Sequence, residues 1–465
     1  MPSTSPSRLK PRRKSGGMIK RKSPTLLLVL VSLMGAAIFW ASTSSSSPAT
    51  RVFSTKNYSA TGQASVYVPI NGEKTNYVNG IAGTTLWENI YLRNGTWYVV
   101  TSHPQSMPEV GTILCAEPLP ERKHIPAGPD RFQYINPSQA SEILGKVAVR
   151  KAGLSMFFND EPGPNGQSFL AHYFHSEVFL SAWRLVTSSY GTVPLPERLM
   201  YRTVPEDWRD KAGLTTWFQQ SVMPNTIIED APVWKDRKAS QTTFVFDRLV
   251  IVDRFSAHMF GHDVGLWNKM TADLPTLPVP KDWMLPLRNS LKNFVLAQGC
   301  ELEREHARVP ILTYVNRQMT SRRLEAEDAD LLLESLNQLH AKGEVEFHNA
   351  IMENMDRADQ FCLALKSDIL IGVHGNGLSH QLWMKPGSAV LEDYALPADL
   401  MGHEYYAIHN DTYLPRSEWI LSDGRAMQQG KGFHSSNIRT HGPYIASLIS
   451  RLAKDRSSPV DKSSL

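Results

Sequence analysis

The stretch that decides the fold is DILIGVHGNGLSHQLWMKPGSAVLED, residues 368–393. The apolar run Ile369–Val373 predicts a buried strand, and the glycine-rich residues 374–377 predict a tight turn into a short helix that runs through Trp383. A Lys-Pro-Gly turn then leads to a second strand at Ala389–Leu391. Two short apolar strands joined through a helix are typical of a parallel sheet covered on both faces.

The same alternation extends upstream of this stretch. Ile311–Val315 predicts a buried strand, and Glu325–Lys342 predicts a helix because its leucines recur at helical spacing and Gly343 follows in the C′ position. Val345–Phe347 predicts a short strand and residues 355–365 a further helix. The fold class is therefore α/β, a doubly wound sheet whose ligand crevice lies at the carboxyl ends of the strands.

Two lobes are expected on either side of a proline-rich connector, Leu274–Pro286. The upstream lobe covers 66–285 and contains strand-like runs such as Trp97–Thr101. The downstream lobe covers 286–453 and holds the alternating pattern, and 454–465 are expected to be a disordered tail.

The N-terminal region predicts a single membrane-spanning segment. A basic tail over 1–24 precedes an uncharged apolar run over 25–41, and a Ser-rich stretch over 42–65 is typical of a flexible stem. The positive-inside rule predicts a cytoplasmic N-terminus, so that the body lies in the lumen. The length of the apolar run and of the basic region before it favours an uncleaved signal anchor. A cleaved signal peptide is the alternative, because the run is also compatible with its apolar region.

The charge and cysteine content limit what the rest of the chain can be, and three candidate sequons agree with a lumenal compartment. The net charge of +4 comes from the N-terminal region, since residues 1–72 carry ten basic and no acidic residues and leave 39 basic against 45 acidic in the rest. Such a body has no nucleic-acid footprint. The three cysteines allow at most one disulfide and leave one thiol. Candidate N-glycosylation sequons begin at Asn57, Asn94 and Asn410.

The glycine loop is the first candidate site. His374, Gly375, Asn376 and Gly377 follow a strand and begin a helix, where small residues and backbone N–H groups suit an anionic phosphate. The order is neither the dinucleotide fingerprint nor a P-loop. The alternative is a tight strand-to-helix turn that needs two glycines.

Three arginines follow the strand that ends at Val315. Arg317, Arg322 and Arg323 offer planar, permanently charged forks that suit a diphosphate, at the same edge of the sheet as the glycine loop. Arg317 is the strongest candidate, because Arg322 and Arg323 also fit the description of surface cations before an acidic helix start.

Two further sets of residues could activate the acceptor or bind the sugar. His172, His175 and Glu177 lie within six residues of one another and could supply a general base, with helix-capping groups as the alternative. The spacing does not support a zinc site. Glu392 ends a strand and could accept from sugar hydroxyls, with a solvated acidic turn as the alternative.

Four blocks in this order resemble glycosyltransferase family 61, and in particular its fungal branch. They are HYFHSEVFLSAWR (172–184), FDRLVIVDR (246–254), ILTYVNRQMTSRRL (311–324) and the opening stretch over 368–393. The family includes β-1,2-xylosyltransferase and a lumenal O-GlcNAc transferase, and its members use xylose, N-acetylglucosamine or arabinofuranose donors.

The resemblance implies a GT-B-like enzyme of two Rossmann-type lobes with a central cleft. It implies a single-pass type II protein of the Golgi or endoplasmic reticulum membrane that inverts the anomeric centre of a nucleotide sugar, such as UDP-xylose or UDP-GlcNAc. Arg317, Arg322 or Arg323, and the loop 374–377, would hold the nucleotide diphosphate. His172, His175 and Glu177 would face the cleft from the acceptor side, toward a glycan or glycoprotein.

Three points qualify this expectation. Phe179 stands where the family often has a carboxylate, so the base is open between Glu177 and the histidines, and a catalytically inactive carbohydrate-binding relative is an alternative. Asp328-Ala-Asp330 begins a helix within a charged run and does not indicate a metal motif, so neither a cofactor nor a divalent metal is predicted. A nicotinamide or flavin oxidoreductase is the remaining alternative, and the missing dinucleotide fingerprint counts against it.

Overall fold

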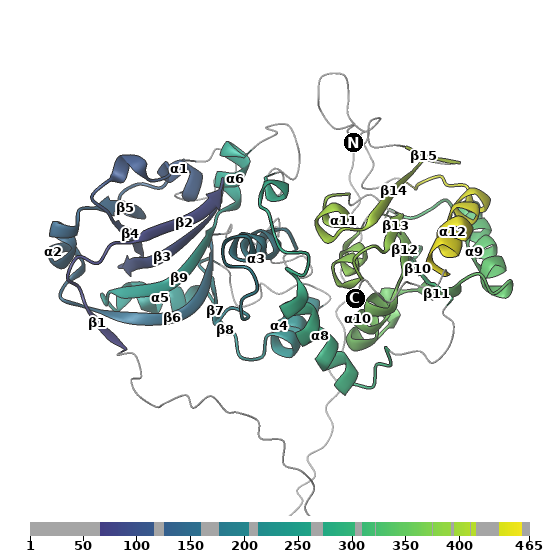
Figure 1. Ribbon diagram of the computed structural model, residues 1–465, viewed down its shortest axis with the longest axis horizontal. Helices are drawn as coiled ribbons and strands as arrows, with labels where there is room; N and C mark the ends of the chain where they lie inside the picture. Colours follow the sequence, from purple (N-terminus) through teal and green to yellow (C-terminus); the bar gives the residue numbers. More distant parts are fainter. Residues whose placement is uncertain are drawn as a thin grey trace, which may run out of the picture. The chain divides into compact units, whose positions relative to one another are not determined.

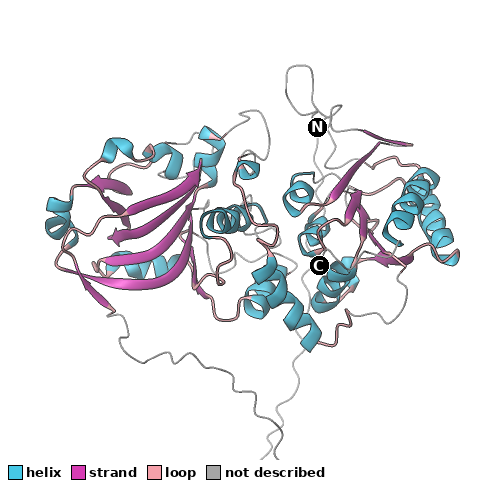
Figure 2. Cartoon of the chain, in the orientation of Figure 1, coloured by secondary structure: helices cyan, strands magenta, loops and turns pink. Residues whose placement is uncertain are grey.

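A computed structural model describes eleven segments of the chain: residues 66–115, 125–159, 176–203, 213–261, 273–302, 309–320, 322–373, 375–391, 395–409, 411–414 and 437–457. The predicted basic tail, membrane segment and stem lie outside these segments. No helix in the described segments is long and apolar enough to cross a membrane. The described strands form two sheets with helices packed around them (Figure 2).

The first sheet has the strand order β5-β4-β3-β9-β6-β7-β8, with β1 paired to β6 and β2 to β3. Its strands are β1 (Tyr67–Pro69), β2 (Asn76–Ile81), β3 (Thr84–Arg93), β4 (Thr96–Val100), β5 (Phe132–Ile135), β6 (Val147–Phe158), β7 (Arg198–Tyr201), β8 (Ile227–Glu229) and β9 (Phe244–Val252). Strands β9, β6, β7 and β8 are mutually parallel, as in a Rossmann-type lobe. Strand β3, in contrast, is antiparallel to β2, β4 and β9.

Tight turns produce this antiparallel extension, which the sequence analysis did not predict. Asn94 and Gly95 have φ values of 52° and 86° and join β3 directly to β4. Asn-Gly is a preferred pair for such two-residue hairpins, because both positions need positive φ. The candidate sequon at Asn94 is therefore also a hairpin turn, and its asparagine is exposed.

Helices flank the first sheet. They are α1 (Val110–Ile113), α2 (Ala140–Leu144), α3 (Ser176–Tyr190), α4 (Leu214–Val222), α5 (Ala231–Ala239) and α6 (Arg254–Phe260), with 3-10 turns at Pro104–Ser106 and Pro137–Gln139. Helix α3 packs on strands β2, β3 and β9 (Figure 1). Its apolar face, including Phe179 and Trp183, is buried as its helical spacing predicts.

The second sheet has the order β11-β10-β12-β13-β14-β15. Its strands are β10 (Ile311–Val315), β11 (Glu346–Ala350), β12 (Ile369–Gly372), β13 (Ala389–Leu391), β14 (Glu404–His409) and β15 (Thr412–Leu414). All neighbours are parallel except β14 and β15. The predicted strands at 311–315 and 389–391 are confirmed, and the strand expected at 345–347 occurs slightly later, at 346–350.

Both faces of this sheet are buried, which explains the continuous apolar runs in its strands. On one face, Leu312 and Tyr314 of β10 join a core with helices α9 (Ala326–Ala341) and α12 (Gly442–Ser457), which pack side by side (Figure 1). On the other face, Val315 joins a core with the 3-10 helix η7 (Asn376–Trp383) and helix α11 (Ala395–Met401). Helix α12 extends past residue 454, where a disordered tail was expected to begin, and its last turn carries Lys454 and Arg456, which suit a helix C-terminus.

Helix α8 (Leu285–Ala297) and helix α10 (Arg357–Lys366) connect the cores around the two sheets. Leu287, Leu291 and Val295 of α8 belong to one hydrophobic core together with α3, α4 and α10. In this core, Trp217 of α4 stacks on Phe361 of α10, with ring centroids 4.7 Å apart. The lobe boundary expected at 285/286 coincides with the start of α8 and stays a prediction.

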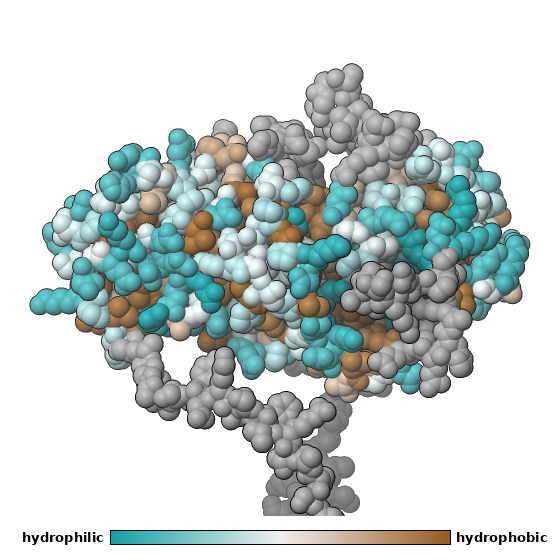
Figure 3. Space-filling view, viewed as in Figure 1, coloured by the Kyte–Doolittle hydropathy of each residue, from teal (hydrophilic) through white to brown (hydrophobic). Residues whose placement is uncertain are grey.

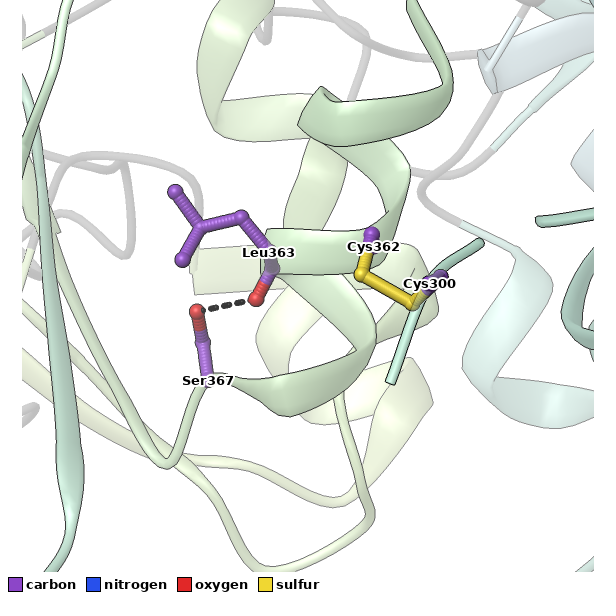
Figure 4. Close-up of a disulfide and its surroundings, with 4 residues drawn as sticks. All are labelled: Cys300, Cys362, Leu363 and Ser367. Carbon is purple, nitrogen blue, oxygen red and sulfur yellow. Dashed lines mark hydrogen bonds between the residues drawn. A yellow bond between two sulfur atoms is a disulfide. The ribbon is translucent and has the colours of Figure 1, made fainter. Parts of the chain in front are cut away.

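A disulfide joins Cys300, just after α8, to Cys362 in α10 (Figure 4). In the same helix, Ser367 Oγ donates to Leu363 O at 2.7 Å, which helps to end α10 before strand β12. The remaining cysteine, Cys115, is buried and free. The three cysteines thus form one disulfide and one thiol, within the limit expected from their number.

Candidate active site

The carboxyl ends of β10 and β12 lie next to each other in the second sheet. The two strands are parallel neighbours, and their paired residues include Val315 and Gly372. The loop after β10 carries Arg317, and the loop after β12 carries Gly375. The sheet therefore brings the arginine block and the glycine loop to one edge, as the sequence predicted.

Arg317 lies directly against Gly375. A Cβ atom on Gly375 would lie 1.3 Å from Arg317 Nη1 and 2.2 Å from Cζ, so a side chain there is incompatible with this position of the guanidinium. The backbone of Gly375 is extended, with φ 163°. Gly375 is therefore required by the close approach of an arginine, and a permanent positive charge lies over the glycine loop.

The other glycines of the loop are explained by packing. A Cβ atom on Gly377 would lie 2.8 Å from Val315 Cγ1, and one on Gly372 would lie 2.8 Å from Leu378 Cδ2. The first contact presses the loop onto the end of β10, and the second joins the end of β12 to η7. Packing thus accounts for glycine at positions 372 and 377, and the phosphate role of Gly377 stays a prediction, whereas Gly375 accommodates a charged group.

Asn376 and the remaining arginines surround this contact. Asn376 is exposed and begins the 3-10 helix η7. Arg317 Nε donates to Thr320 Oγ1 at 3.3 Å. Arg322 has φ 58° and is half-buried, and Arg323 is exposed. One short loop thus carries all three arginines, with Arg317 nearest to the glycines.

Several predicted site residues lie outside the described segments. They are His172, His175, His374, Glu392 and the sequon residues Asn57 and Asn410. Glu177 is the second residue of α3, and only its backbone is described. Phe179, two residues later, is 2% exposed and stacks near Trp183. The position at which the family often has a carboxylate is therefore part of the core here.

Sequence reasoning did not distinguish Asp253, which organises the corresponding edge of the first sheet. Asp253 follows β9 and Asn159 follows β6, and these strands are parallel neighbours. Asp253 Oδ2 accepts from Asn159 Nδ2 at 2.6 Å and from Cys115 N at 2.8 Å, and Oδ1 accepts from Ser256 N at 2.9 Å. Its place at a strand end was the only sequence signal for this role.

The surroundings of Asp253 indicate a structural role. The side chain is fully buried and caps helix α6. Burial raises the pKa of the Asp253 carboxyl, and its hydrogen bonds oppose that change. Burial also raises the pKa of the neighbouring Cys115 thiol to about 12, which keeps it protonated at neutral pH. Neither group is accessible to a substrate hydroxyl.

Two arginines converge on Asn159 at this edge. Arg202 Nη1 donates to Asn159 Oδ1 at 2.7 Å and Arg131 Nη2 donates to it at 3.3 Å. Since Asn159 also donates to Asp253, it links two guanidinium groups to the buried carboxylate. The edge is thereby rigid and polar.

Metal ligation is not evident in the described segments, which contain no group of three His, Cys, Asp or Glu side chains that could hold a metal ion. Hydrophobic side chains on the face shown in Figure 3 are interspersed with hydrophilic ones. The chemically distinctive feature of the second sheet is therefore the arginine and glycine contact at its edge.

A sequence profile of the family Glycosyltransferase 61 matches residues 154–391, just over half of the chain. The match extends from β6 to the last residue of β13 and includes Arg317 and Gly375. No curated protein is significantly similar to the chain.

Proposed function

Because this chain belongs to glycosyltransferase family 61, we propose that it transfers a sugar from a nucleoside-diphosphate donor, with inversion, to a glycan or glycoprotein. Membership of the family implies glycosyltransferase activity, and hence a donor and an acceptor substrate. UDP-xylose and UDP-GlcNAc are the first donors to test.

The observation that carries the donor assignment is the contact between Arg317 and Gly375. The guanidinium lies over a loop that has no side chain at this point, at the carboxyl edge of a parallel sheet. Such an edge is where α/β sheets bind ligands, and a guanidinium fork pairs with two oxygens of a phosphate at once. Arg322 and Arg323 on the same loop add positive charge.

In the proposed reaction, an acceptor hydroxyl attacks the anomeric carbon from the side opposite the diphosphate. The bond from the anomeric carbon to the diphosphate oxygen breaks, and the hydroxyl proton passes to a base, for which Glu177, His175 and His172 are the candidates. The arginines stabilise the departing diphosphate electrostatically. This arrangement would operate without a divalent metal. In this proposal the donor binds on the side of residues 286–453 and the acceptor on the side of residues 66–285, in a GT-B-like cleft.

The compartment is also part of the proposal. We place the enzyme in the Golgi or endoplasmic reticulum membrane as a type II protein with a lumenal body, on the strength of the N-terminal sequence. The Cys300–Cys362 disulfide supports an oxidising environment, where such bonds form and persist.

Binding of UDP to the purified full-length chain tests the donor site. A ligand that binds only the folded state stabilises it, by about 2.7 kcal/mol at a hundredfold excess over Kd, so UDP should raise the melting temperature even with EDTA present. Arg317→Ala should weaken UDP binding by about 10- to 150-fold, since a charge-assisted hydrogen bond contributes about 1.5–3 kcal/mol. Arg451→Ala, which removes an exposed arginine of α12, is the matched control and should bind UDP normally.

The outcome separates the two main hypotheses. UDP binding that is unaffected by Arg317→Ala would contradict the assigned phosphate role. The inactive-relative alternative is favoured by the burial of Phe179, and it predicts glycan binding without release of UDP from any UDP-sugar. UDP release that depends on acceptor would exclude that alternative.

A further inference from the structure

The loop between β10 and α9 is closed at its base by one side chain, that of Gln318. Gln318 Nε2 donates to Leu324 O at 3.1 Å, and Gln318 Oε1 accepts from Leu324 N at 2.9 Å. The side-chain amide thus satisfies both backbone groups of one residue, much as a neighbouring strand would. Between these two residues the described part of the loop includes Arg322 and Arg323.

Both ends of the closure are held by backbone hydrogen bonds to other parts of the chain. Gln318 N donates to Asn316 Oδ1 at 3.0 Å, and the buried Asn316 donates from its own N–H to Ala350 O at 2.8 Å. At the other end, Ile438 N donates to Arg323 O at 2.8 Å, and Leu324 forms a bridge with Ile438. One end is therefore held by β11 and the other by the residues just before α12, and the Gln318 amide spans the distance between them.

The closed loop carries the positive charges of the proposed donor site. Arg317 precedes the closure directly, and Arg322 and Arg323 lie within it. Arg322 has φ 58°, a conformation that is unfavourable for a non-glycine residue and persists only where its surroundings enforce it. Arg323 Nη1 also lies 3.5 Å from Gln318 O, so the loop contacts itself across the closure.

We infer that Gln318 is a positioning residue for the donor site: by bridging to Leu324 it fixes the loop that presents Arg317, Arg322 and Arg323 to the donor diphosphate. This inference rests on the proposed function. It assigns to Gln318 no contact with the substrate itself. The residue acts through the orientation of the arginines, so its loss should weaken diphosphate binding without removing any charge.

The chemistry of the bridge is specific to an amide. Glutamine presents a donor and an acceptor side by side, and both are used here. An ionised glutamate can accept from Leu324 N, but its other carboxylate oxygen is also an acceptor and cannot bond to Leu324 O. A protonated glutamate can donate its O–H to Leu324 O. Methionine has a similar length and makes neither bond. These differences make the role of Gln318 measurable.

The test measures UDP affinity of the purified full-length chain by titration calorimetry at pH 8 and pH 5. We compare the unsubstituted chain with Gln318→Met, Gln318→Glu and the control Gln338→Glu, which adds the same charge on an exposed face of α9. Because UDP itself titrates, each variant is expressed as a ratio to the unsubstituted chain at the same pH. Melting temperatures report folding separately.

We expect Gln318→Met to bind UDP about tenfold more weakly at both pH values. Gln318→Glu should be at least as weak at pH 8 and should recover toward the unsubstituted chain at pH 5. Recovery is expected because an ordinary glutamic acid titrates near 4.3, and an adjacent carbonyl oxygen raises that value. Gln338→Glu should show no change in affinity at either pH.

Two results would overturn the inference. If Gln318→Met melts at a lower temperature but binds UDP within twofold of the unsubstituted chain, Gln318 is structural only. If Gln318→Glu shows the same deficit at pH 8 and pH 5, its bridge does not set the affinity. Absence of UDP binding by the unsubstituted chain is a distinct result, which would overturn the proposed function together with this inference.

Discussion

Replacement of Gly375 by alanine isolates the contact on which the donor site depends. The backbone of Gly375 is extended, with φ 163° and ψ 165°, a conformation that any residue adopts. The substitution therefore adds no backbone strain. Its effect comes from one methyl group, which would lie 1.3 Å from Arg317 Nη1, 2.2 Å from Cζ and 2.9 Å from Nε.

The size of the effect follows from these distances. Non-bonded carbon contacts are comfortable at about 3.5–4 Å, so the guanidinium has to withdraw by about 2 Å. A displacement of that size removes a hydrogen bond to a phosphate oxygen. A charge-assisted hydrogen bond contributes about 1.5–3 kcal/mol, so UDP should bind Gly375→Ala roughly 10- to 150-fold more weakly.

A double-mutant cycle identifies the cause. UDP affinity is measured by calorimetry for the unsubstituted chain, Gly375→Ala, Arg317→Ala and the double variant, with melting temperatures as the check on folding. If the methyl group acts by displacing Arg317, the double variant binds no more weakly than Arg317→Ala alone. If the two losses add within about 0.5 kcal/mol, Gly375 acts independently of Arg317 and the reasoning is refuted.

Two further predictions concern stability. Burial lowers the pKa of His380 from 6.5 to about 4, so the unfolded chain takes up a proton first and the free energy of unfolding should fall by up to about 3 kcal/mol between pH 6.5 and pH 4. Denaturant titrations at several pH values should show a flatter dependence in His380→Gln, and an unchanged slope would contradict this. Asp253→Ala should lower the free energy of unfolding by about 3–5 kcal/mol, because it leaves three buried donors without their acceptor. The control Asp247→Ala breaks a partly exposed pair with Arg150 and should cost no more than about 1 kcal/mol; equal losses would argue against the structural role of Asp253.

The second sheet was the most predictable part of the fold. Its strands are buried on both faces, so apolar runs such as Ile311–Val315 and Ala389–Leu391 stand out between helices with regular leucine spacing. The parallel order then places Arg317 and Gly375 at one edge without further information. Topology, rather than any single motif, made this part of the site predictable.

The antiparallel strands of the first sheet were not predicted, although a signal was present. Asn94-Gly95 is a preferred hairpin pair, but Asn94-Gly-Thr was interpreted only as a glycosylation sequon. Both readings are compatible, because the asparagine is exposed at the tip of the turn. The residues Asn94-Gly95-Thr96 are therefore both a candidate sequon and part of a hairpin turn.

Contacts between distant parts of the chain could not be derived from the sequence. Asp328 lies in the first turn of α9. It accepts from Thr440 N at 2.9 Å and pairs with Arg439, and both partners are more than a hundred residues away in the sequence. Asp253 likewise shows its role only when its distant partners Cys115 and Asn159 are known. Such hydrogen bonds follow from where the strands bring the chain, and residue type alone does not specify them.

The hydrophobic core that α3, α4, α8 and α10 share has a consequence for recombination between relatives. Trp183, Trp217 and Phe361 come from distant parts of the sequence but pack in or against one cluster. A chimera that exchanged only the residues after 286 would leave the part of this cluster that comes from residues 86–284 facing a foreign surface. Because Cys300 and Cys362 both lie after residue 286, the disulfide would be exchanged intact, but such a chimera should keep its stability only if Trp183 and Trp217 are exchanged to match.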